Sequence, residues 1–285
     1  MKNPEKYGIL LLICAMAVRG ERIMAYLYKL KLQVQVYLTY RFEVFANIAT
    51  HFILILANVF LWNCVYSDQK DILGVGRGQM ITYSVLSSCL AVMYHCGIQS
   101  SLNKDVREGN IALLLMKPIH LLGAYFAEDV GAVAVRAVSV SVPIFLLGLL
   151  FLPLQPPVLF RVLPLVMISY VFGFMILWLL SALVSMFTFV TMELGNMGVV
   201  KDMIVAILSG SMIPLWFFPD RVEKMLMMTP FPYTYQLPLG LYIGKIDIGE
   251  GLRQIGIQAF WMLLLGVCVA LAWKKAKNKV LIQGG

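Results

Sequence analysis

The sequence predicts an all-α polytopic membrane protein with six transmembrane helices. Of its 285 residues, 60% are hydrophobic and only 13% are charged. So little polar surface cannot cover a water-soluble globule of this size, and so many apolar residues exclude a disordered chain. The apolar residues are also gathered into uncharged runs of about 20 residues, which is the length that a helix needs to cross a bilayer.

Six uncharged runs have a suitable length. They are Val44–Ser67, Gly78–Asn103, Ala137–Phe160, Val162–Thr191, Met203–Pro219 and Gln254–Trp273. Prolines at 153, 156 and 157 predict that the third helix stops near Leu152, and Pro214 predicts a kinked or broken fifth helix. No carboxylate lies at mid-depth in these runs, which argues against a carrier coupled to protons or sodium.

The residues before the first run have a different pattern. Gly8–Val18 is apolar but too short to span, and the basic residues that follow it disfavour a cleaved signal peptide. Ile23–Tyr40 has apolar residues three to four positions apart, which predicts an amphipathic helix on the inner membrane surface. We therefore expect one transmembrane domain, 1–285, with an N-terminal segment and interfacial helix at 1–43, a six-span bundle at 44–273 and a basic tail at 274–285.

The distribution of lysine and arginine predicts the orientation. With six spans both termini share a side, and that side carries fifteen basic residues against seven on the other. The positive-inside rule places both termini in the cytoplasm. This asymmetry explains the net charge of +8, so no nucleic-acid partner is expected.

The sequence predicts no catalytic, cofactor or metal site. The five cysteines are scattered, without a CxxC motif or a Cys/His cluster. The string nearest to a nucleotide-binding P-loop, at 240–246, is one residue short and lacks the terminal hydroxyl. We therefore expect the energy source for any transport to be a separate subunit.

Polar residues form stripes on the first two predicted spans. They are Asn47, His51 and Asn58 on the first span and Ser84, Ser88 and His95 on the second. At 100° per residue each set shares one helix face. Such stripes either hold neighbouring helices together or line a substrate pathway or dimer face, and the sequence leaves both interpretations open.

Two connections have unusual composition. The one after the second run has a charged turn at 103–110, a short apolar helix and Pro118, a profile suited to docking in a protein groove. The one after the fifth run holds five prolines and many aromatic residues within 208–240. We expect it to return into the membrane as short broken helices, which are tolerated only where protein buries them.

These two connections carry a resemblance to a known family. Val106–Pro118, VREGNIALLLMKP, resembles the "REG…LL.KP" signature of bacterial ABC-2 type permeases. The segments 209–219 and 230–238 resemble the outer-loop pattern of the same group, and 28–43 resembles its N-terminal segment. The resemblance covers about residues 25–275; the chain before about Met24 departs from it.

The resemblance implies the permease subunit of an ABC exporter in the bacterial plasma membrane, with the six-helix fold of type V exporters. An N-terminal interfacial helix, a coupling helix after the second span and re-entrant helices before the sixth are implied as well. The implied partners are two copies of an ATP-binding subunit, which bind ATP and magnesium, a second or sister permease, and membrane lipids.

Two sets of candidate residues follow. The expected contacts with the ATPase are Asp105, Arg107, Glu108, Gly109, Ile111, Leu114, Leu115, Lys117 and Pro118, with Ile111, Leu114 and Leu115 filling its groove. The candidates for an outer gate are Pro214, Trp216, Phe217, Phe218, Pro219, Phe231 and Tyr233.

The sequence favours export of an amphipathic or hydrophobic molecule, such as a drug, a lipid or an antimicrobial peptide. No outer segment is large enough to receive cargo from a binding protein, and the predicted pathway has no fixed charge. One alternative is a membrane-embedded lipid-modifying enzyme, for which Glu128 and Asp129 near Arg136 are the best candidates, although a salt-bridged helix start is a simpler interpretation. Separately, Arg136 lies at the start of the third predicted helix, where its long side chain is expected to reach the headgroups. A second alternative is a non-transporting membrane partner in sensing or immunity.

Overall fold

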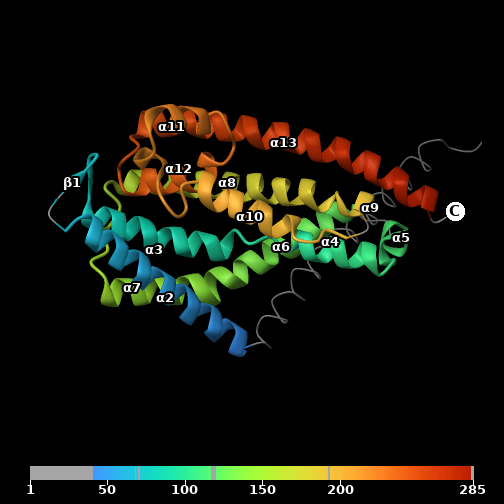
Figure 1. The fold of residues 1–285 in the computed structure, drawn as a ribbon, viewed down its shortest axis with the longest axis horizontal. Coiled ribbons are helices and arrows are strands. Elements are labelled where there is room, and N and C mark those ends of the chain that lie inside the picture. The colour runs from blue at the N-terminus through green and yellow to red at the C-terminus, as the bar shows by residue number, and fades with distance from the viewer. Residues whose placement is uncertain (1–40, 68, 70, 117–119, 192, 284–285) are drawn as a thin grey trace, which may run out of the picture.

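The computed structural model describes residues 41–67, 69, 71–116, 120–191 and 193–283. These residues form an elongated bundle of helices with one two-stranded hairpin (Figure 1). The predicted interfacial helix before Arg41 lies outside the described residues, as do Lys117 and Pro118.

Five helical segments of the described residues are long and apolar enough to cross a bilayer. They are Val44–Val65, Arg77–Arg107, Leu121–Phe151, Phe160–Thr191 and Ile248–Lys277. They overlap the first, second, third, fourth and sixth predicted spans, so these parts of the prediction are confirmed at the level of helices. The bundle is therefore that of a multi-pass membrane protein.

The fifth predicted span differs from the structure. Helix α10 (Met197–Leu208) has 12 residues, which rise about 18 Å against a hydrocarbon core of about 30 Å. Its end is set by Gly210, at a φ of +79°, and by Pro214, which cannot continue a helix. The predicted kinked or broken helix is therefore confirmed, whereas the fifth run forms no bilayer-crossing helix among the described residues: α10 starts earlier than predicted, at Met197, and cannot cross the bilayer alone.

The third span starts earlier than predicted. It runs without interruption through α6 (Leu121–Arg136), a π-helical turn η1 (Ala137–Ser141) and α7 (Val142–Phe151). The predicted end near Leu152 is confirmed, because that residue is extended and caps α7. The predicted start at Ala137 is wrong, because a search for uncharged runs stops at Arg136 even though the helix does not.

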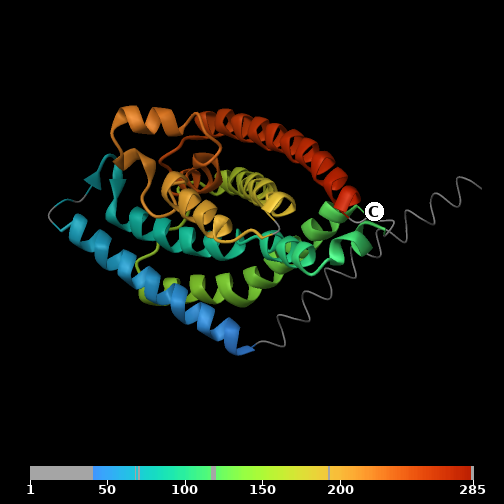
Figure 2. The same ribbon diagram turned by 45° about the vertical axis from the view of Figure 1, so that its right-hand side comes forward.

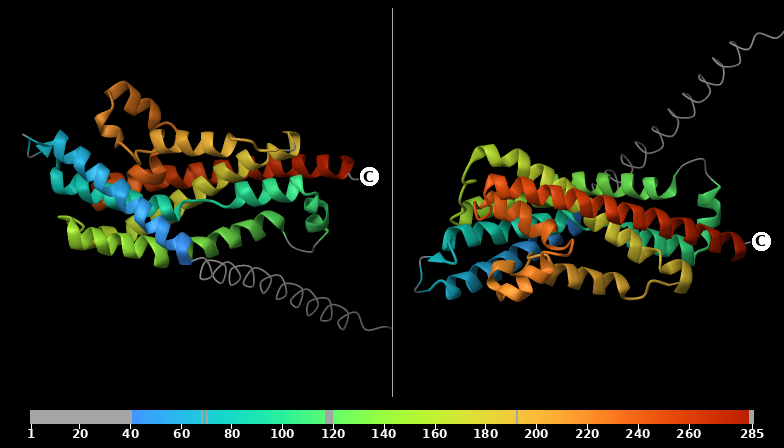
Figure 3. Two further views of the ribbon diagram at one scale, coloured as in Figure 1. Left: turned by 60° about the horizontal axis from the view of Figure 1, so that its bottom comes forward. Right: turned by 90° about the horizontal axis from the view of Figure 1, so that it is seen from above.

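The second span is interrupted. Helix α3 (Arg77–Met93) ends at Tyr94, and α4 (Ile98–Arg107) starts after Gly97. The short helix α5 (Asn110–Leu115) follows, at the same end of the bundle as the C-terminal part of α13 (Ile248–Gln283; Figures 1 and 3). We call this the α5 end, and we call the residues Tyr94–Gly97 the break.

Short elements gather at the opposite end, which we call the hairpin end. Strands β1 (Asp71–Ile72) and β2 (Val75–Gly76) pair antiparallel there, Ile72 opposite Val75. The single-turn helix η3 (Leu215–Phe217), α11 (Asp220–Leu226) and α12 (Pro232–Tyr242) precede α13 (Figure 1). The expectation of short broken helices is confirmed for the described residues; nearly every residue of α12 is buried inside protein, whereas α11 has no buried residue.

Helix α8 (Leu163–Ser185) forms the centre of the bundle, preceded by η2 (Phe160–Val162) and followed by α9 (Thr188–Thr191). It packs most extensively against α12 and α13, and Figure 2 shows it enclosed by neighbouring helices. The buried Gln258 of α13 is hydrogen-bonded to both α8 and α12. Its amide nitrogen donates to the carbonyls of Ser169 in α8 (2.7 Å) and Tyr233 in α12 (2.8 Å).

Gly173 permits the close approach of α8 to α12. A Cβ atom at this position would lie 2.9 Å from the carbonyl oxygen of Thr234 and 2.7 Å from the hydroxyl of Tyr94. Two helices can approach this closely only where a residue has no side chain.

We predict that Gly173→Ala destabilises the protein by about 1–3 kcal/mol, because the added methyl group overpacks this contact. The measurement is the melting temperature of the purified full chain. Gly266→Ala in α13 is the matched control, since a Cβ there meets no atom within 4 Å and alanine favours a helix. Equal melting temperatures of the two variants would contradict the assigned packing of α8 on α12.

Candidate functional site

The break in the second span leaves helix ends inside the bundle. The first N–H groups of α4 have no partner within their own helix, and neither do the last carbonyls of α3. Within a bilayer such groups must be satisfied by protein. Both sides of the break are bound by charged residues of the third span.

Asp129 of α6 binds the start of α4. Its carboxylate accepts hydrogen bonds from the backbone N–H groups of Gly97 (2.7 Å) and Ile98 (3.2 Å), and from the indole nitrogen of Trp178 in α8 (2.9 Å). The side chain is 4% exposed. A negative charge at a helix N-terminus is favoured by the helix dipole. Gly97 permits the contact, since a Cβ there would lie 2.8 Å from the Asp129 carboxylate.

Arg136 binds the other side of the break. Its guanidinium donates to the carbonyl of His95 (2.7 Å) and to the carbonyl of Ala132 in its own helix (3.2 Å), and the residue is buried. The expectation that Arg136 reaches the headgroups is therefore wrong. The salt-bridged helix start is wrong as well, because Asp129 lies mid-helix with neutral donors and no described ion pair links it to Arg136.

A buried carboxylate thus lies within the third membrane-crossing segment, where the sequence led us to expect none. The uncharged-run criterion excluded residues 121–136 from every span, and Asp129 with them. The omission has a physical cause: the partners that make this charge tolerable are 31 to 49 residues away in sequence.

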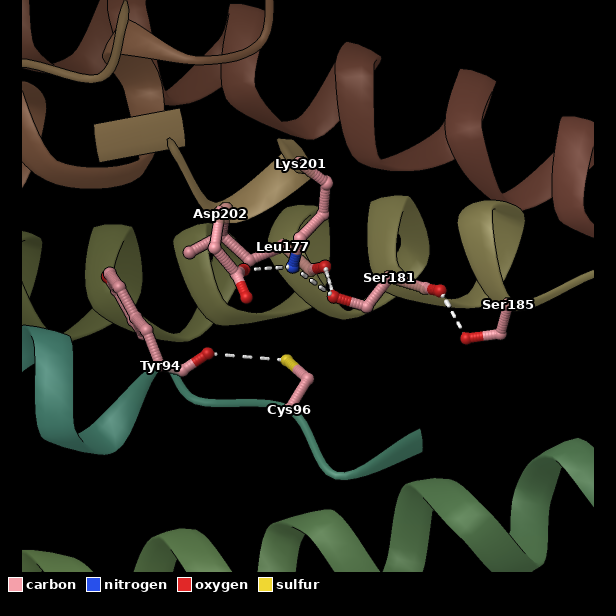
Figure 4. A network of polar contacts seen from close by, with 7 residues as sticks. All are labelled: Tyr94, Cys96, Leu177, Ser181, Ser185, Lys201 and Asp202. Carbon is pink, nitrogen blue, oxygen red and sulfur yellow. Dashed lines mark hydrogen bonds and ion pairs between the residues drawn. The ribbon is translucent and has the colours of Figure 1, made fainter. Parts of the chain in front are cut away.

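A second polar group joins α10 to α8 (Figure 4). The ammonium of Lys201 lies 2.6 Å from the carboxylate of Asp202 and donates to the hydroxyl of Ser181 (2.8 Å). The Ser181 hydroxyl in turn donates to the carbonyl of Leu177 in its own helix. The Lys201 side chain is 13% exposed, whereas that of Asp202 is 59% exposed. Both residues fall between the uncharged runs of the sequence and were not among the predicted site residues, although a charged pair directly before an apolar run was a visible signal.

The polar stripes of the first two spans are only partly brought to this site. Ser84 and Ser88 donate to carbonyls of their own helix, Met80 and Ser84. The amide of Asn58 does the same with Leu54, and Asn47 and His51 lie elsewhere along α2 (Arg41–Val65). Of the six stripe residues, His95 is the one that lies in the break, and it is exposed there.

The expected coupling residues lie around a tight turn at the α5 end. Gly109 has a φ of +75°, which glycine adopts without strain, and it separates α4 from α5. Asp105 accepts a hydrogen bond from the hydroxyl of Tyr125 in α6 (2.5 Å), whereas Arg107 and Glu108 are exposed.

The apolar residues of α5 face differently from the expectation. Ile111 is 5% exposed and packs into the core, with Leu114 and Leu115 partly buried beside it. Leu113 and Met116 are 66% and 82% exposed. The apolar residues of α5 that a partner can reach are therefore Leu113 and Met116, whereas Ile111 is buried. Whether a six-residue helix turns one leucine or its neighbour outward depends on what lies beneath it.

The expected gate residues are divided between the hairpin end and the groove beside α10, which Phe231 lines. Trp216 packs edge-on against Tyr83 with ring centres 5.5 Å apart, and Phe217 lies 5.2 Å from Trp62 of α2. Tyr233 is buried, and its hydroxyl donates to the carbonyl of Met227. Pro214 is buried, Phe218 and Phe231 are half-buried, and Pro219 is exposed.

Tyr66, which directly follows α2, is hydrogen-bonded to the hairpin. The hydroxyl of Tyr66 donates to the carbonyl of Val75 (3.0 Å). Burial, and then the nearby carboxylate of Asp71, raise the pKa of Tyr66 to about 12. The phenol therefore stays a hydrogen-bond donor at physiological pH.

Several grooves open on the described part of the bundle, among them two that adjoin α8. One, of about 530 Å³, lies between α8 and α10 and includes Leu180, Val200, Lys201 and Phe231 in its lining. The other, of about 370 Å³, is apolar and lies between α3, the π-helical turn, α8 and α12. Among the described residues, no group of three histidine, cysteine or acidic side chains is placed to hold a metal ion.

Comparison with known families agrees with this architecture. The family described as "ABC-2 family transporter protein" matches residues 52–284. Neither the curated proteins nor the solved structures gave a match. The matched region includes all of the break, the α5 turn, α10 and the short helices of the hairpin end. Because it extends over most of the chain, this protein belongs to the ABC-2 family of membrane transporters.

Proposed function

We propose that this chain is the membrane-spanning permease subunit of an ATP-driven ABC exporter, which moves an amphipathic or hydrophobic substrate out of the cell. The observation that carries the proposal is the family match over residues 52–284. Members of this family are typically permeases without ATPase activity of their own. ATP and magnesium are then bound by two copies of a separate ATP-binding subunit.

The connection from α5 to the break supports a coupling role for 104–118. Helix α5 follows α4 through Gly109, and the first turn of α4 is bound by Asp129 of α6 and, through it, by Trp178 of α8. Asp105 provides a second link to α6 through Tyr125. A displacement of α5 by the ATPase therefore acts on three helices at once, through hydrogen bonds between otherwise rigid elements.

The orientation follows from charge. The α5 end carries Lys104 and Arg107 as well as Lys274, Lys275 and Lys277 of α13, and the excess over the opposite end comes from the seven basic residues of 1–43, which the sequence count assigns to the same side. The positive-inside rule places this end and both termini in the cytoplasm. The hairpin end then faces outward, and its aromatic group (Trp216, Phe217, Phe218, Phe231 and Tyr233, with Pro214 and Pro219) serves as the exit gate.

Exposed apolar helices support a dimer, with either a second copy or a sister permease. Only 11% of the residues in the span of α2 are buried, and α10 exposes most of its length. Because α10 cannot cross the bilayer alone, a pathway between two copies is the arrangement that covers it. The stripe of Asn47, His51 and Asn58 on α2 is the face proposed to meet the partner.

The enzyme alternative loses Asp129 and Arg136 from its candidate residues. Asp129 and Arg136 are buried and engaged by the break, so neither is free to act on a lipid. No observation favours a sensing or immunity role over transport.

The export function predicts ATP-dependent accumulation of an amphipathic dye in inverted membrane vesicles that contain the permease and its ATPase. The cytoplasmic face of such vesicles is outside, so export appears as uptake. The measurement is dye fluorescence with ATP, compared with a non-hydrolysable analogue. Uptake of a polar solute by right-side-out vesicles, without dye accumulation in inverted ones, would show that the direction is wrong.

The coupling role predicts that Glu108→Lys combined with Leu113→Asp lowers dye uptake at least about tenfold while the protein remains inserted. The substitutions place charge on the exposed surface of the α5 turn, where a partner's apolar groove would have to desolvate it. Copurification of the ATPase and initial uptake rates are the two measurements.

Leu73→Asp is the matched control for this variant, because Leu73 is a similarly exposed leucine (57%) at the opposite end. Normal assembly and normal uptake in the double variant would rule out the coupling role of this segment.

The dimer face predicts disulfide crosslinking between copies at Asn58→Cys in an otherwise cysteine-free chain. The control is Leu263→Cys, at an exposed position of α13 (66%) that the proposed interface does not include. The measurement is the crosslinked fraction on a non-reducing gel, in each nucleotide state. A crosslink at 263 and none at 58, in a complex shown to be intact, would refute this face.

A further inference from the structure

Asp202 is an unusual residue for its surroundings. Helix α10 is otherwise apolar apart from the adjacent Lys201, and its exposed residues include Val199 (59%) and Met203 (62%). A charged residue in such a helix is costly, and it marks a functional position by default. Asp202 is also accessible, since 59% of its side chain is exposed.

The other charges of the region are shielded. Asp129 and Arg136 are 4% and 6% exposed, and each is bound by backbone groups of the break. Lys201 is held between Ser181 and Asp202 and is 13% exposed. The accessible charge is therefore the carboxylate of Asp202, and Lys201 fixes its position from the protein side.

Asp202 lies beside the break and on an apolar helix face. Figure 4 shows it above Tyr94, and it is close enough to His95 and Tyr235 for its charge to act on both. Residues three and four positions apart share a helix face, so Val199, Asp202 and Met203 lie on one surface. This surface combines exposed apolar area with an accessible carboxylate, whose counter-ion Lys201 is mostly buried.

We propose that Asp202 selects cargo by charge, and that the exported molecule is an amphipathic cation. Its apolar part lies on Val199 and Met203, and its ammonium or guanidinium group pairs with the carboxylate. The inference rests on the proposed export function and names its substrate class. It replaces the expectation of a pathway without fixed charge.

The sign of the charge decides between cargo classes. An anionic amphiphile would have to leave water and approach a carboxylate, which is disfavoured, whereas a cation gains a charge-assisted hydrogen bond. Lys201 cannot serve an anion without giving up its bonds to Asp202 and Ser181.

The test uses three dansyl-labelled dodecyl amphiphiles that differ only in their head group, which is a primary ammonium, a hydroxyl or a sulfonate. Initial ATP-dependent uptake is measured in inverted vesicles that contain the permease with its ATPase. With the native chain we expect the ammonium probe to enter about threefold to fivefold faster than the hydroxyl probe, as for a partly exposed ion pair. The sulfonate probe should be slowest.

Asp202→Asn should bring the ammonium-to-hydroxyl ratio to about one. Asp202→Glu should retain the preference, because it keeps the charge. Since Asp202→Asn leaves the mostly buried Lys201 without its counter-charge, the double variant Lys201→Met with Asp202→Asn serves as a second neutral form. Asp220→Asn, which removes an exposed acid of α11, is the control that should keep the native ratio.

The outcomes separate the two proposals. A native cation preference that persists in both neutral forms overturns the role of Asp202, and so does a native complex that takes up all three probes equally. Loss of the dimer in Asp202→Asn with an unchanged ratio assigns the carboxylate to the subunit interface and also overturns it. If the native complex takes up none of the probes with ATP, the export function itself fails.

Discussion

The structure depends on one constraint: a helix that breaks inside a membrane must have its free backbone groups satisfied by protein. The second span breaks at Tyr94–Gly97, and the third span provides both partners. Asp129 accepts from the start of α4, and Arg136 donates to the carbonyl of His95. The other local features follow from this. Position 97 has to be glycine because of the approach of Asp129, and α8 has to place Trp178 against the same carboxylate.

The break divides the second span between the two ends of the molecule. Its α3 part is bound to the loop after α10, because the hydroxyls of Tyr83 and Ser87 donate to the carbonyls of Gly210 (2.6 Å) and Ser211 (2.7 Å). Its α4 part continues into the α5 turn. One membrane-crossing segment thus touches the proposed outer gate and the proposed ATPase contact, and its two halves are joined by a turn with no internal helical hydrogen bonds. That geometry suits a protein whose inner end is moved by a partner.

The break also explains why polar groups collect in one place. Where α3 and α4 separate, His95 is exposed, and α10 brings Lys201 and Asp202 to the region of Tyr94 and Cys96 (Figure 4). Lys201 is anchored on α8 through Ser181, whose hydroxyl already bonds its own helix. Two kinds of charge result: buried ones that stabilise the break, and one carboxylate left accessible beside it.

The sequence by itself determined the membrane class, the helices that overlap the first, second, third, fourth and sixth predicted spans, the short helices of the hairpin end and the family. These depend on hydropathy, on prolines such as Pro214 and Pro219, and on local strings such as VREGN, all of which act over a few neighbouring residues. Tertiary structure alone decided that Arg136 lies in the core and not at the headgroups, that Asp129 lies inside a span, and that Leu113 and not Ile111 faces outward. It also decided that α10 is a short helix with an accessible acid. The physical reason is that hydropathy assigns each residue a cost as though it faced lipid. The true cost depends on a partner, and here the partners of Asp129 and Arg136 are backbone groups of a different helix, 31 and 41 residues away.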